Sequence, residues 1–367
     1  MTVRIAQLVH PASDVVDEAF LRDFPEVEVA KAHNLESLAN ALDGAEIFHV
    51  YNSAFTAEFA RLVRDKGRAL KWIQFTTVGI EIGLRAGLPE GVWVTNSGDV
   101  SQRVLASHAI ALMLGVMRGF PRFERLRERR EWARHTMSSH IIDPDHARMV
   151  ILGMGHIGQE IARKAKAFDM EVICVTRASS PAVPEIDRVV PREKVDEVLP
   201  TADVVMVAMP LDKGTRGLLS AERIALMKTT AILVNISRGK VVDEAALAHA
   251  LTEGHIMGAG LDALAEEPLP AASPLWDLPN VLITHHVGGQ GGPQLWRRMS
   301  QLIRDNTRRY LSGAPLKHVA RTPDGTLQGF KMLQLAGRQS RTLRQRGNYS
   351  QRNFEHRISQ YSGKSID

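Results

Sequence analysis

One short segment, which runs from Gly153 to Gly158 and reads GMGHIG, restricts the fold of this chain more than any other. It follows the apolar run Met149–Leu152 and precedes Ile157–Phe168, where apolar residues recur at helical spacing. A Gly-x-Gly-x-x-Gly turn between a strand and a helix is typical of dinucleotide-binding proteins. Its first glycine allows the tight turn, Gly155 lets a pyrophosphate approach the backbone, and its last glycine lets helix and strand pack closely. The segment therefore predicts a diphosphate site at the helix N-terminus, and a strand–turn–helix without a ligand is the alternative.

The end of the next expected strand, Glu171–Val175, bears on the choice of cofactor. NAD-binding proteins carry an acidic residue there, which binds the ribose hydroxyls. This sequence has Thr176 and Arg177 instead, so no carboxylate repels a 2′-phosphate, and a guanidinium pairs well with one. We therefore expect NADP(H) to be preferred, with NAD(H) possible. The alternative is that Arg177 is a surface arginine at a strand end.

Strand-like and helix-like segments alternate through two successive parts of the chain. The expected strands of the first part are Val3–Val9, Val27–Ala30, Glu46–Val50, Leu70–Phe75 and Val92–Thr95. Those of the second part are Met149–Leu152, Glu171–Val175, Asp203–Ala208, Ala231–Asn235, Gly258–Leu261 and Val281–Thr284. Helices are expected between them, at about 100–132 with a break at Gly119–Pro121, and at 293–311. Such alternation predicts an α/β fold with two doubly wound parallel-sheet domains and a cleft between them.

Composition excludes several classes of protein. The 367 residues are enough for two domains, each with its own core. Cys174 is the only cysteine, so an internal disulfide and a cysteine-based zinc site are excluded. The first residues hold too short an apolar run for a signal peptide, and no segment has transmembrane length. The sequence therefore predicts a cytoplasmic protein.

The formal charge of +5 is concentrated in the last part of the chain. Residues 323–367 hold eight basic and three acidic residues, which leaves residues 1–322 formally neutral. We therefore expect no nucleic-acid surface on the folded body. The composition of this tail, rich in Arg, Gln, Ser, Gly and Asn, predicts a basic and poorly ordered segment.

Arg238, Glu267 and His286 follow the last three expected strands of the second part. Parallel strands end at one edge of the sheet, where α/β proteins bind their ligands. A guanidinium grips a carboxylate in two places, and an imidazole beside a carboxylate transfers protons near neutral pH. These groups suit the reduction of a 2-oxo acid, with Arg238 on the substrate carboxylate and His286 as the proton donor. Each of them alone also fits a structural role, and their common order after successive strands favours the catalytic interpretation.

From about residue 1 to 320 the sequence resembles the D-isomer-specific 2-hydroxyacid dehydrogenases, which include glyoxylate/hydroxypyruvate, D-lactate and D-3-phosphoglycerate enzymes. The matching motifs are GMGHIG, Pro210-Leu211 with Thr215-Arg216-Gly217-Leu218, NISRGKVVDEAAL, GAGLDALAEEPLP, and a histidine followed by Val-Gly-Gly. The resemblance implies Arg238, Glu267 and His286 as the catalytic residues. It further implies a small 2-oxo or 2-hydroxy acid substrate and a homodimer formed through the cofactor domain.

The resemblance also implies binding residues. Thr77–Ile80 is similar to the loop whose amides hold the substrate carboxylate, so Val78 and Gly79 are expected to bind substrate together with Arg238. Asp262 is expected near the nicotinamide carboxamide. The full set of expected cofactor-binding residues is Gly153, Gly155, His156, Ile157, Gly158, Thr176, Arg177, Pro210, Thr215, Ile236 and Asp262.

These observations predict three parts in the chain. A flavodoxin-like substrate domain is expected at residues 1–98 plus 290–322, a Rossmann NAD(P)-binding domain at 99–289, and the basic tail at 323–367. Two departures from the family pattern matter: His285 replaces a usual proline, and Tyr51–Ser53 lacks an arginine that several relatives carry, which disfavours a substrate with a second anionic group. No metal site is expected, because neighbouring histidines on a strand point to opposite faces.

The predicted activity is hydride transfer between NAD(P)H and carbon 2 of a small 2-oxo or 2-hydroxy acid. The alternative is a dinucleotide-sensing binding protein, or a corepressor-like scaffold, without physiological turnover. The complete set of arginine, glutamate and histidine favours the enzyme, whereas the basic tail is the one feature that favours the binding protein.

Overall fold

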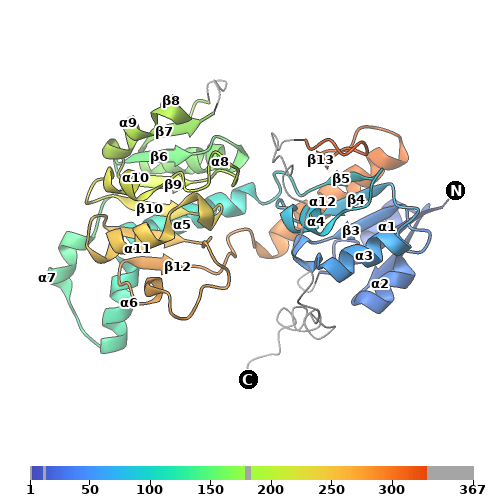
Figure 1. Ribbon diagram of the computed structural model, residues 1–367, viewed down its shortest axis with the longest axis horizontal. Coiled ribbons are helices and arrows are strands. Elements are labelled where there is room, and N and C mark those ends of the chain that lie inside the picture. Colours follow the sequence, from blue (N-terminus) through green and yellow to red (C-terminus); the bar gives the residue numbers. More distant parts are fainter. Residues whose placement is uncertain (1, 11–13, 178–182, 329–367) are drawn as a thin grey trace, which may run out of the picture. The chain divides into compact units, whose positions relative to one another are not determined.

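The computed structural model describes residues 2–10, 14–177 and 183–328 (Figure 1). The chain divides into two compact units. The first contains the described residues up to Val100 and from Gly292 onward, and the second runs from Ser101 to Gly291. Most of the predicted tail, from residue 329 onward, lies outside the described residues.

The first unit contains a six-stranded sheet in the order β13-β5-β4-β3-β1-β2. Its strands are β1 (Val3–Leu8), β2 (Val27–Ala32), β3 (Ile47–Val50), β4 (Trp72–Phe75), β5 (Trp93–Thr95) and β13 (Val319–Arg321). Its helices are α1 (Glu18–Asp23), α2 (Leu35–Ala41), η1 (Asn52–Ala54), α3 (Ala57–Lys66), α4 (Glu81–Ala86) and α12 (Gly292–Leu311). The first five strands pair in parallel in the flavodoxin-like order, and β13 joins β5 antiparallel.

Helix α12 joins this unit although its residues follow those of the second unit. Asn306 Nδ2 donates to Gln74 Oε1 on β4 at 3.1 Å, and Asn306 Oδ1 accepts from the backbone amide of Lys317 at 2.8 Å. Both amide side chains are buried, so these hydrogen bonds satisfy groups that would be costly to bury unpaired. They fix how α12 packs on the sheet.

The second unit contains a seven-stranded parallel sheet in the order β12-β11-β10-β9-β6-β7-β8 (Figure 1). Its strands are β6 (Arg148–Leu152), β7 (Glu171–Thr176), β8 (Arg188–Pro191), β9 (Val204–Val207), β10 (Ile232–Asn235), β11 (Gly258–Leu261) and β12 (Val281–Ile283). Its α-helices are α5 (Gln102–Met117), α6 (Phe120–Arg129), α7 (Arg134–Met137), α8 (His156–Ala165), α9 (Val195–Val198), α10 (Ala221–Ala225) and α11 (Glu244–Thr252). Short 3-10 helices are η2 (Ser138–His140), η3 (Lys166–Phe168), η4 (Arg192–Lys194), η5 (Leu199–Thr201), η6 (Gly239–Val241) and η7 (Pro274–Trp276).

The strand order of the second unit is that of a Rossmann sheet with one further strand. The inner strands β6, β9 and β10 are buried almost throughout, because helices cover both faces. Helix α5 packs against α8, β10 and β11 and contributes apolar residues to the core on that face. The predicted α/β fold with two doubly wound sheets is confirmed.

Two strands were not predicted. β8 has four residues, only one of them buried, and ends on Pro191, which suits an edge strand because proline donates no ladder hydrogen bond. β13 has three residues and pairs antiparallel at the other sheet's edge. Neither segment shows the sustained apolar pattern that identifies an inner strand.

The helical stretch expected at about 100–132 is divided at the break that the sequence predicts. α5 ends at Met117 and α6 begins at Phe120, because Gly119 adopts a left-handed conformation with φ of 70°. Among the described residues no single helix is long and apolar enough to cross a membrane, and α5 with α6 meets that criterion only as a bent pair, by length and composition.

Candidate active site

The glycine segment lies where the strand order of the second unit reverses, between β6 and β9. Gly153 has φ of 115°, and a Cβ there would lie 2.5 Å from the carbonyl oxygen of Ala208. A Cβ on Gly158 would lie 2.1 Å from the carbonyl oxygen of Gly153. Both positions therefore require glycine for the packing of α8 against the strands.

Gly155 differs from these two glycines. It is the N-cap of α8, no side chain caps that helix end, and a Cβ on Gly155 would meet no atom within 4 Å. His156 is exposed and Ile157 is half-buried in the first turn. The open helix N-terminus offers backbone N–H groups and a positive dipole end, which fit the diphosphate of a dinucleotide.

The other expected cofactor-binding residues follow strands of the same unit. Thr176 ends β7, and the exposed Arg177 comes directly after it. Thr215 is buried and holds a turn, since its hydroxyl donates to the carbonyl oxygen of Pro210 at 2.8 Å. Ile236 follows β10 and is 5% exposed. Arg177 is close to a residue that the sequence did not single out, because its Nη1 lies 3.2 Å from Asp212 Oδ2.

The structure brings His286 and Glu267 together. His286 Nδ1 lies 2.8 Å from Glu267 Oε2, and the amide of Leu264 donates to Glu267 Oε1 at 3.0 Å. The hydrogen bond to Glu267 raises the pKa of His286 above its ordinary value, although burial opposes this. Burial opposes ionisation of Glu267, but hydrogen bonds from His286 and Leu264 outweigh it and lower the pKa of the carboxyl. The pair therefore favours a protonated ring beside an ionised carboxylate.

Arg238 lies in the same part of the unit. Its Nη1 donates to the carbonyl oxygen of Ser237 at 2.8 Å, and its own carbonyl accepts from Asn235 Nδ2 at 3.2 Å. The positive charge of Arg238 lowers the pKa values of both His286 and Glu267, which places the guanidinium within electrostatic reach of the pair. The three predicted catalytic residues thus gather at the carboxyl ends of β10, β11 and β12. His285 instead contacts Trp276, with 6.2 Å between the ring centroids.

Asp262 supports the loop that carries His286. Its carboxylate is 1% exposed and accepts hydrogen bonds from the amides of Val287 and Gly288 at 3.0 Å. Burial raises the pKa of Asp262, but hydrogen bonds from the His108 and Thr284 side chains and from the Gly288 amide outweigh it and lower the pKa to about 2. Contact with the nicotinamide carboxamide stays a prediction for Asp262, whereas its contacts within the protein make it a positioning residue.

Sequence reasoning missed the two side chains that complete this network. Thr284 Oγ1 donates to Asp262 Oδ1 at 2.7 Å and lies 2.9 Å from His108 Nε2. His108 comes from α5, a helix whose sequence is largely apolar. No local pattern marks a contact between residues 176 positions apart.

Val78 and Gly79 lie in the first unit, in the loop between β4 and α4. The carbonyl oxygen of Val78 accepts from Asn96 Nδ2 at 2.9 Å, and that of Gly79 accepts from Thr77 Oγ1 at 2.9 Å. These bonds give the loop a defined shape, and its part in substrate binding stays a prediction.

Comparison with known proteins identifies the family. Residues 110–288 match the family model described as D-isomer specific 2-hydroxyacid dehydrogenase, NAD binding domain. The glyoxylate reductase of Thermococcus onnurineus is 37% identical over 234 residues, which are 62% of this chain and 69% of that protein. The chain belongs to the D-isomer specific 2-hydroxyacid dehydrogenase family. Members of this family are NAD(P)-dependent enzymes that act on CH–OH donors.

Two other members of the family match a larger share of the chain. The D-3-phosphoglycerate dehydrogenase of Methanocaldococcus jannaschii is 32% identical over 83% of this chain, which spans 57% of that protein's length. A solved D-isomer specific 2-hydroxyacid dehydrogenase of Xanthobacter autotrophicus, in complex with NADPH and MES, superposes with a TM-score of 0.71 and 27% identity. That match covers 87% of this chain and 98% of the solved one.

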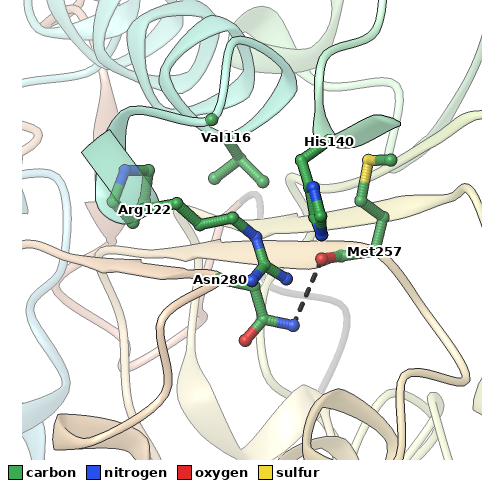
Figure 2. A pocket seen from close by; sticks show the side chains of 7 residues that line it. Val116, Arg122, His140, Met257 and Asn280 are labelled. Atoms are coloured by element: carbon green, nitrogen blue, oxygen red, sulfur yellow. Dashed lines mark hydrogen bonds between the residues drawn. The ribbon is translucent and has the colours of Figure 1, made fainter. Parts of the chain in front are cut away.

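A small pocket of the second unit lies away from Arg238, Glu267 and His286. It is lined by Val116, Gly119, Pro121, Arg122, His140, Met257 and Asn280. Asn280 Nδ2 donates a hydrogen bond to the carbonyl oxygen of Met257 at 3.2 Å (Figure 2). Asn280 directly precedes β12 and Met257 directly precedes β11, so this pocket is at the amino ends of the strands, whereas the predicted catalytic residues follow the carboxyl ends. In the described part of the chain no group of three or more His, Cys, Asp or Glu side chains has an arrangement suited to a metal ion.

Substitution of two glycines separates packing from cofactor binding. We expect Gly158→Ala to lower the free energy of unfolding by about 1–3 kcal/mol, because its methyl group meets backbone. Gly155 has φ of −80°, and a Cβ there would meet no atom within 4 Å. Gly155→Ala should therefore change the free energy of unfolding by less than about 1 kcal/mol. Its affinity for the dinucleotide should nevertheless fall by about tenfold, because the methyl group occupies space in front of α8. Thermal unfolding and calorimetric titration measure the two effects, and unchanged cofactor affinity in Gly155→Ala would contradict the assignment.

The Glu267→Gln substitution tests the charge coupling between Glu267 and His286. Removal of the carboxylate removes the main cause that raises the pKa of His286, while the positive charge of Arg238 remains. The pKa of His286 should therefore fall, and the ring should lose its proton at a lower pH than in the parent protein. The chemical shifts of the histidine ring protons, followed through a pH titration, measure this. An unchanged or higher pKa would show that the pair is not coupled in solution.

Proposed function

We propose that the protein is an oxidoreductase that transfers a hydride between NAD(P)H and carbon 2 of a small 2-oxo or 2-hydroxy acid. The observation that carries this proposal is the 2.8 Å contact between His286 Nδ1 and Glu267 Oε2, with the charge of Arg238 acting on both groups. A proton donor, its orienting carboxylate and an anion-binding cation are what reduction of a 2-oxo acid requires.

In the direction of reduction, NAD(P)H held by the second unit would supply the hydride. Arg238 holds the substrate carboxylate, and the amides of Val78 and Gly79 are proposed to bind it as well. The protonated ring of His286 donates its Nε2 proton to the carbonyl oxygen, which becomes the hydroxyl of the product. Glu267 stabilises the protonated ring and fixes its orientation through Nδ1. In the direction of oxidation, neutral His286 takes the proton back.

The substrate is proposed to be a small acid without a second anionic group. Relatives of this chain are named glyoxylate reductase, and Tyr51–Ser53 supplies no arginine for a further anion. Asn52 lies within this segment, and its Oδ1 accepts a hydrogen bond from the backbone amide of Gly83 in α4 at 3.1 Å. Glyoxylate and hydroxypyruvate fit this description.

NADP(H) is proposed as the preferred cofactor, with NAD(H) also accepted. Arg177 supports this, because it follows β7 where NAD-binding proteins carry a carboxylate. The solved relative from Xanthobacter autotrophicus contains NADPH. Gly153, Gly155, His156, Ile157 and Gly158 would hold the diphosphate, and Thr176, Arg177, Pro210, Thr215, Ile236 and Asp262 would complete the cofactor site.

The two units are proposed to divide these tasks, with the first as the substrate domain and the second as the cofactor domain. The cofactor domain is further proposed to form a homodimer. Figure 1 shows α6 and α7 extending from the body of this unit. Phe120 and Phe123 on α6 are 60% and 39% exposed, and Trp132 after it is 94% exposed. Large apolar side chains gathered on a surface are typical of an interface.

The decisive experiment is the oxidation of NADPH and, separately, NADH, followed at the reduced-nicotinamide absorbance with glyoxylate, hydroxypyruvate, pyruvate and a bulkier aromatic 2-oxo acid. We expect turnover that prefers NADPH and the smaller acids. His286→Ala should lower kcat by about a hundredfold or more while the affinity for cofactor stays within about twofold. Near-native turnover of His286→Ala would overturn the assignment of the proton donor. Cofactor binding without turnover of any acid would favour a dinucleotide-sensing protein.

Sedimentation velocity tests the proposed dimer. The parent chain should sediment as a dimer, and Phe120→Asp with Trp132→Asp should shift it toward the monomer, because charges replace the exposed apolar groups. Leu226→Asp, on an apolar residue that is 40% exposed outside α6, is the matched control and should leave the dimer intact. A monomeric parent chain would contradict the proposal.

A further inference from the structure

Two arginines and one aspartate form a charged cluster beside the end of β7. Arg177 Nη1 lies 3.2 Å from Asp212 Oδ2. Arg192, in η4, donates from Nη1 to the carbonyl oxygen of Gly214, two residues after this aspartate, at 3.4 Å. We refer to Arg177, Arg192 and Asp212 as the β7 cluster. Its formal charge is +1, and all three residues belong to the second unit.

Electrostatic coupling within the β7 cluster supports this grouping. Burial lowers the pKa of the Arg192 guanidinium, the charge of Asp212 raises it, and the charge of Arg177 lowers it. Both other members are therefore within electrostatic reach of Arg192. Its Nε is buried and has no hydrogen-bond partner among the described residues, so part of its donor capacity is unused.

The carboxylate of Asp212 is held in place by its own turn. Its Oδ1 accepts from the amide of Gly214 at 2.8 Å, and its backbone amide donates to Thr215 Oγ1 at 2.7 Å. The side chain of Asp212 is 18% exposed, whereas that of Arg177 is 47% exposed. The aspartate is thus a fixed group, and the arginine is the member of the pair that has room to meet a ligand.

We propose that Asp212 is a specificity-determining residue of the cofactor site, because it pairs with the guanidinium that an adenosine 2′-phosphate would bind. The inference rests on the proposed role of Arg177 toward NADP(H). A phosphate that pairs with Arg177 has to displace Asp212 or share the guanidinium with it. In either case two anions come close together, and the carboxylate weakens binding of the 2′-phosphate selectively. A cofactor with a free 2′-hydroxyl does not meet this repulsion.

With Asp212 beside Arg177, one site would accept both proposed cofactors. Arg177 and Arg192 attract a 2′-phosphate, while Asp212 offsets part of their charge and limits the preference for NADP(H). Without the carboxylate the β7 cluster would carry two positive charges toward a dianion. The strength of the preference therefore depends on a residue that lies 35 positions beyond Arg177 in the sequence.

The Asp212→Asn substitution tests the inference without any reaction. Asparagine retains an oxygen that accepts from the amide of Gly214 but removes the charge that faces Arg177. The probes are 2′,5′-ADP and 5′-AMP, titrated calorimetrically into the full chain, because these differ only in the 2′-phosphate. We expect Asp212→Asn to bind 2′,5′-ADP about fivefold more tightly, a modest gain because the pair is partly exposed to solvent. Its affinity for 5′-AMP should stay within about twofold.

Glu171→Gln is the matched control. Glu171 also pairs with an arginine, Arg148, at 2.8 Å, but it begins β7, whereas Arg177 follows the end of that strand. At about 3.3 Å per residue the two positions are roughly 20 Å apart. The control removes the same charge from the same unit and should change the affinity for neither probe. An equal gain in Glu171→Gln would attribute the effect to net charge and overturn the inference.

Arg177→Gln separates failure of the inference from failure of the proposed cofactor preference. Loss of the difference between the two probes in Arg177→Gln supports the role of that arginine, and Asp212→Asn should then have no effect in the Arg177→Gln background. If the parent chain binds both probes equally, the proposed NADP(H) preference fails, and the inference fails with it only when Asp212→Asn also binds both probes equally. If the parent discriminates but Asp212→Asn leaves both affinities unchanged, the inference alone is wrong.

Discussion

Parallel pairing of the seven strands in the second unit is the constraint on which the candidate site depends. Because every strand runs in the same direction, the segments that follow β6, β7, β9, β10, β11 and β12 all emerge at one edge. The glycine turn, Arg177, Arg238, Glu267 and His286 lie on these segments. Residues more than a hundred positions apart thus reach one edge, whereas the pocket at the amino ends of β11 and β12 contains none of them. Close packing of α8 against β6, which Gly153 and Gly158 permit, keeps the helix N-terminus at that same edge.

Local strain at His286 is balanced by a buried network. His286 has φ of 54°, a left-handed conformation that costs a residue with a Cβ about 1–2 kcal/mol. The backbone of Asp262 accepts the amide of His286 at 2.9 Å, and its carboxylate accepts the next two amides. A Cβ on Gly288 would lie 2.6 Å from Asp262 Oδ2 and 2.9 Å from His108, which explains a glycine there. Hydrogen bonds to a charged acceptor contribute about 1.5–3 kcal/mol each, enough to offset the strain.

Electrostatics distinguish the two acidic groups that serve the site. Asp262 is buried and accepts several hydrogen bonds, and its lowered pKa of about 2 keeps the carboxylate ionised near neutral pH. Glu267 is partly exposed, and its carboxylate pairs with the ring of His286. The first carboxylate therefore shapes the loop, and the second adjusts the proton affinity of the residue that the loop carries. Asp212 is a third case, since its charge faces Arg177, the residue proposed to bind a 2′-phosphate.

Local patterns in the sequence determined the inner strands, the glycine turn and the order of Arg238, Glu267 and His286, because periodicity and turn chemistry depend on neighbouring residues. The sequence did not predict the short edge strands β8 and β13, since partly buried edge strands carry no clear alternation of apolar and polar residues. It also did not predict the partners of the site residues. Asp212 beside Arg177, and His108 with Thr284 beside Asp262, come from separate elements. Only the packing of those elements brings their side chains together, so the tertiary structure alone decided how the candidate residues are charged, held and oriented.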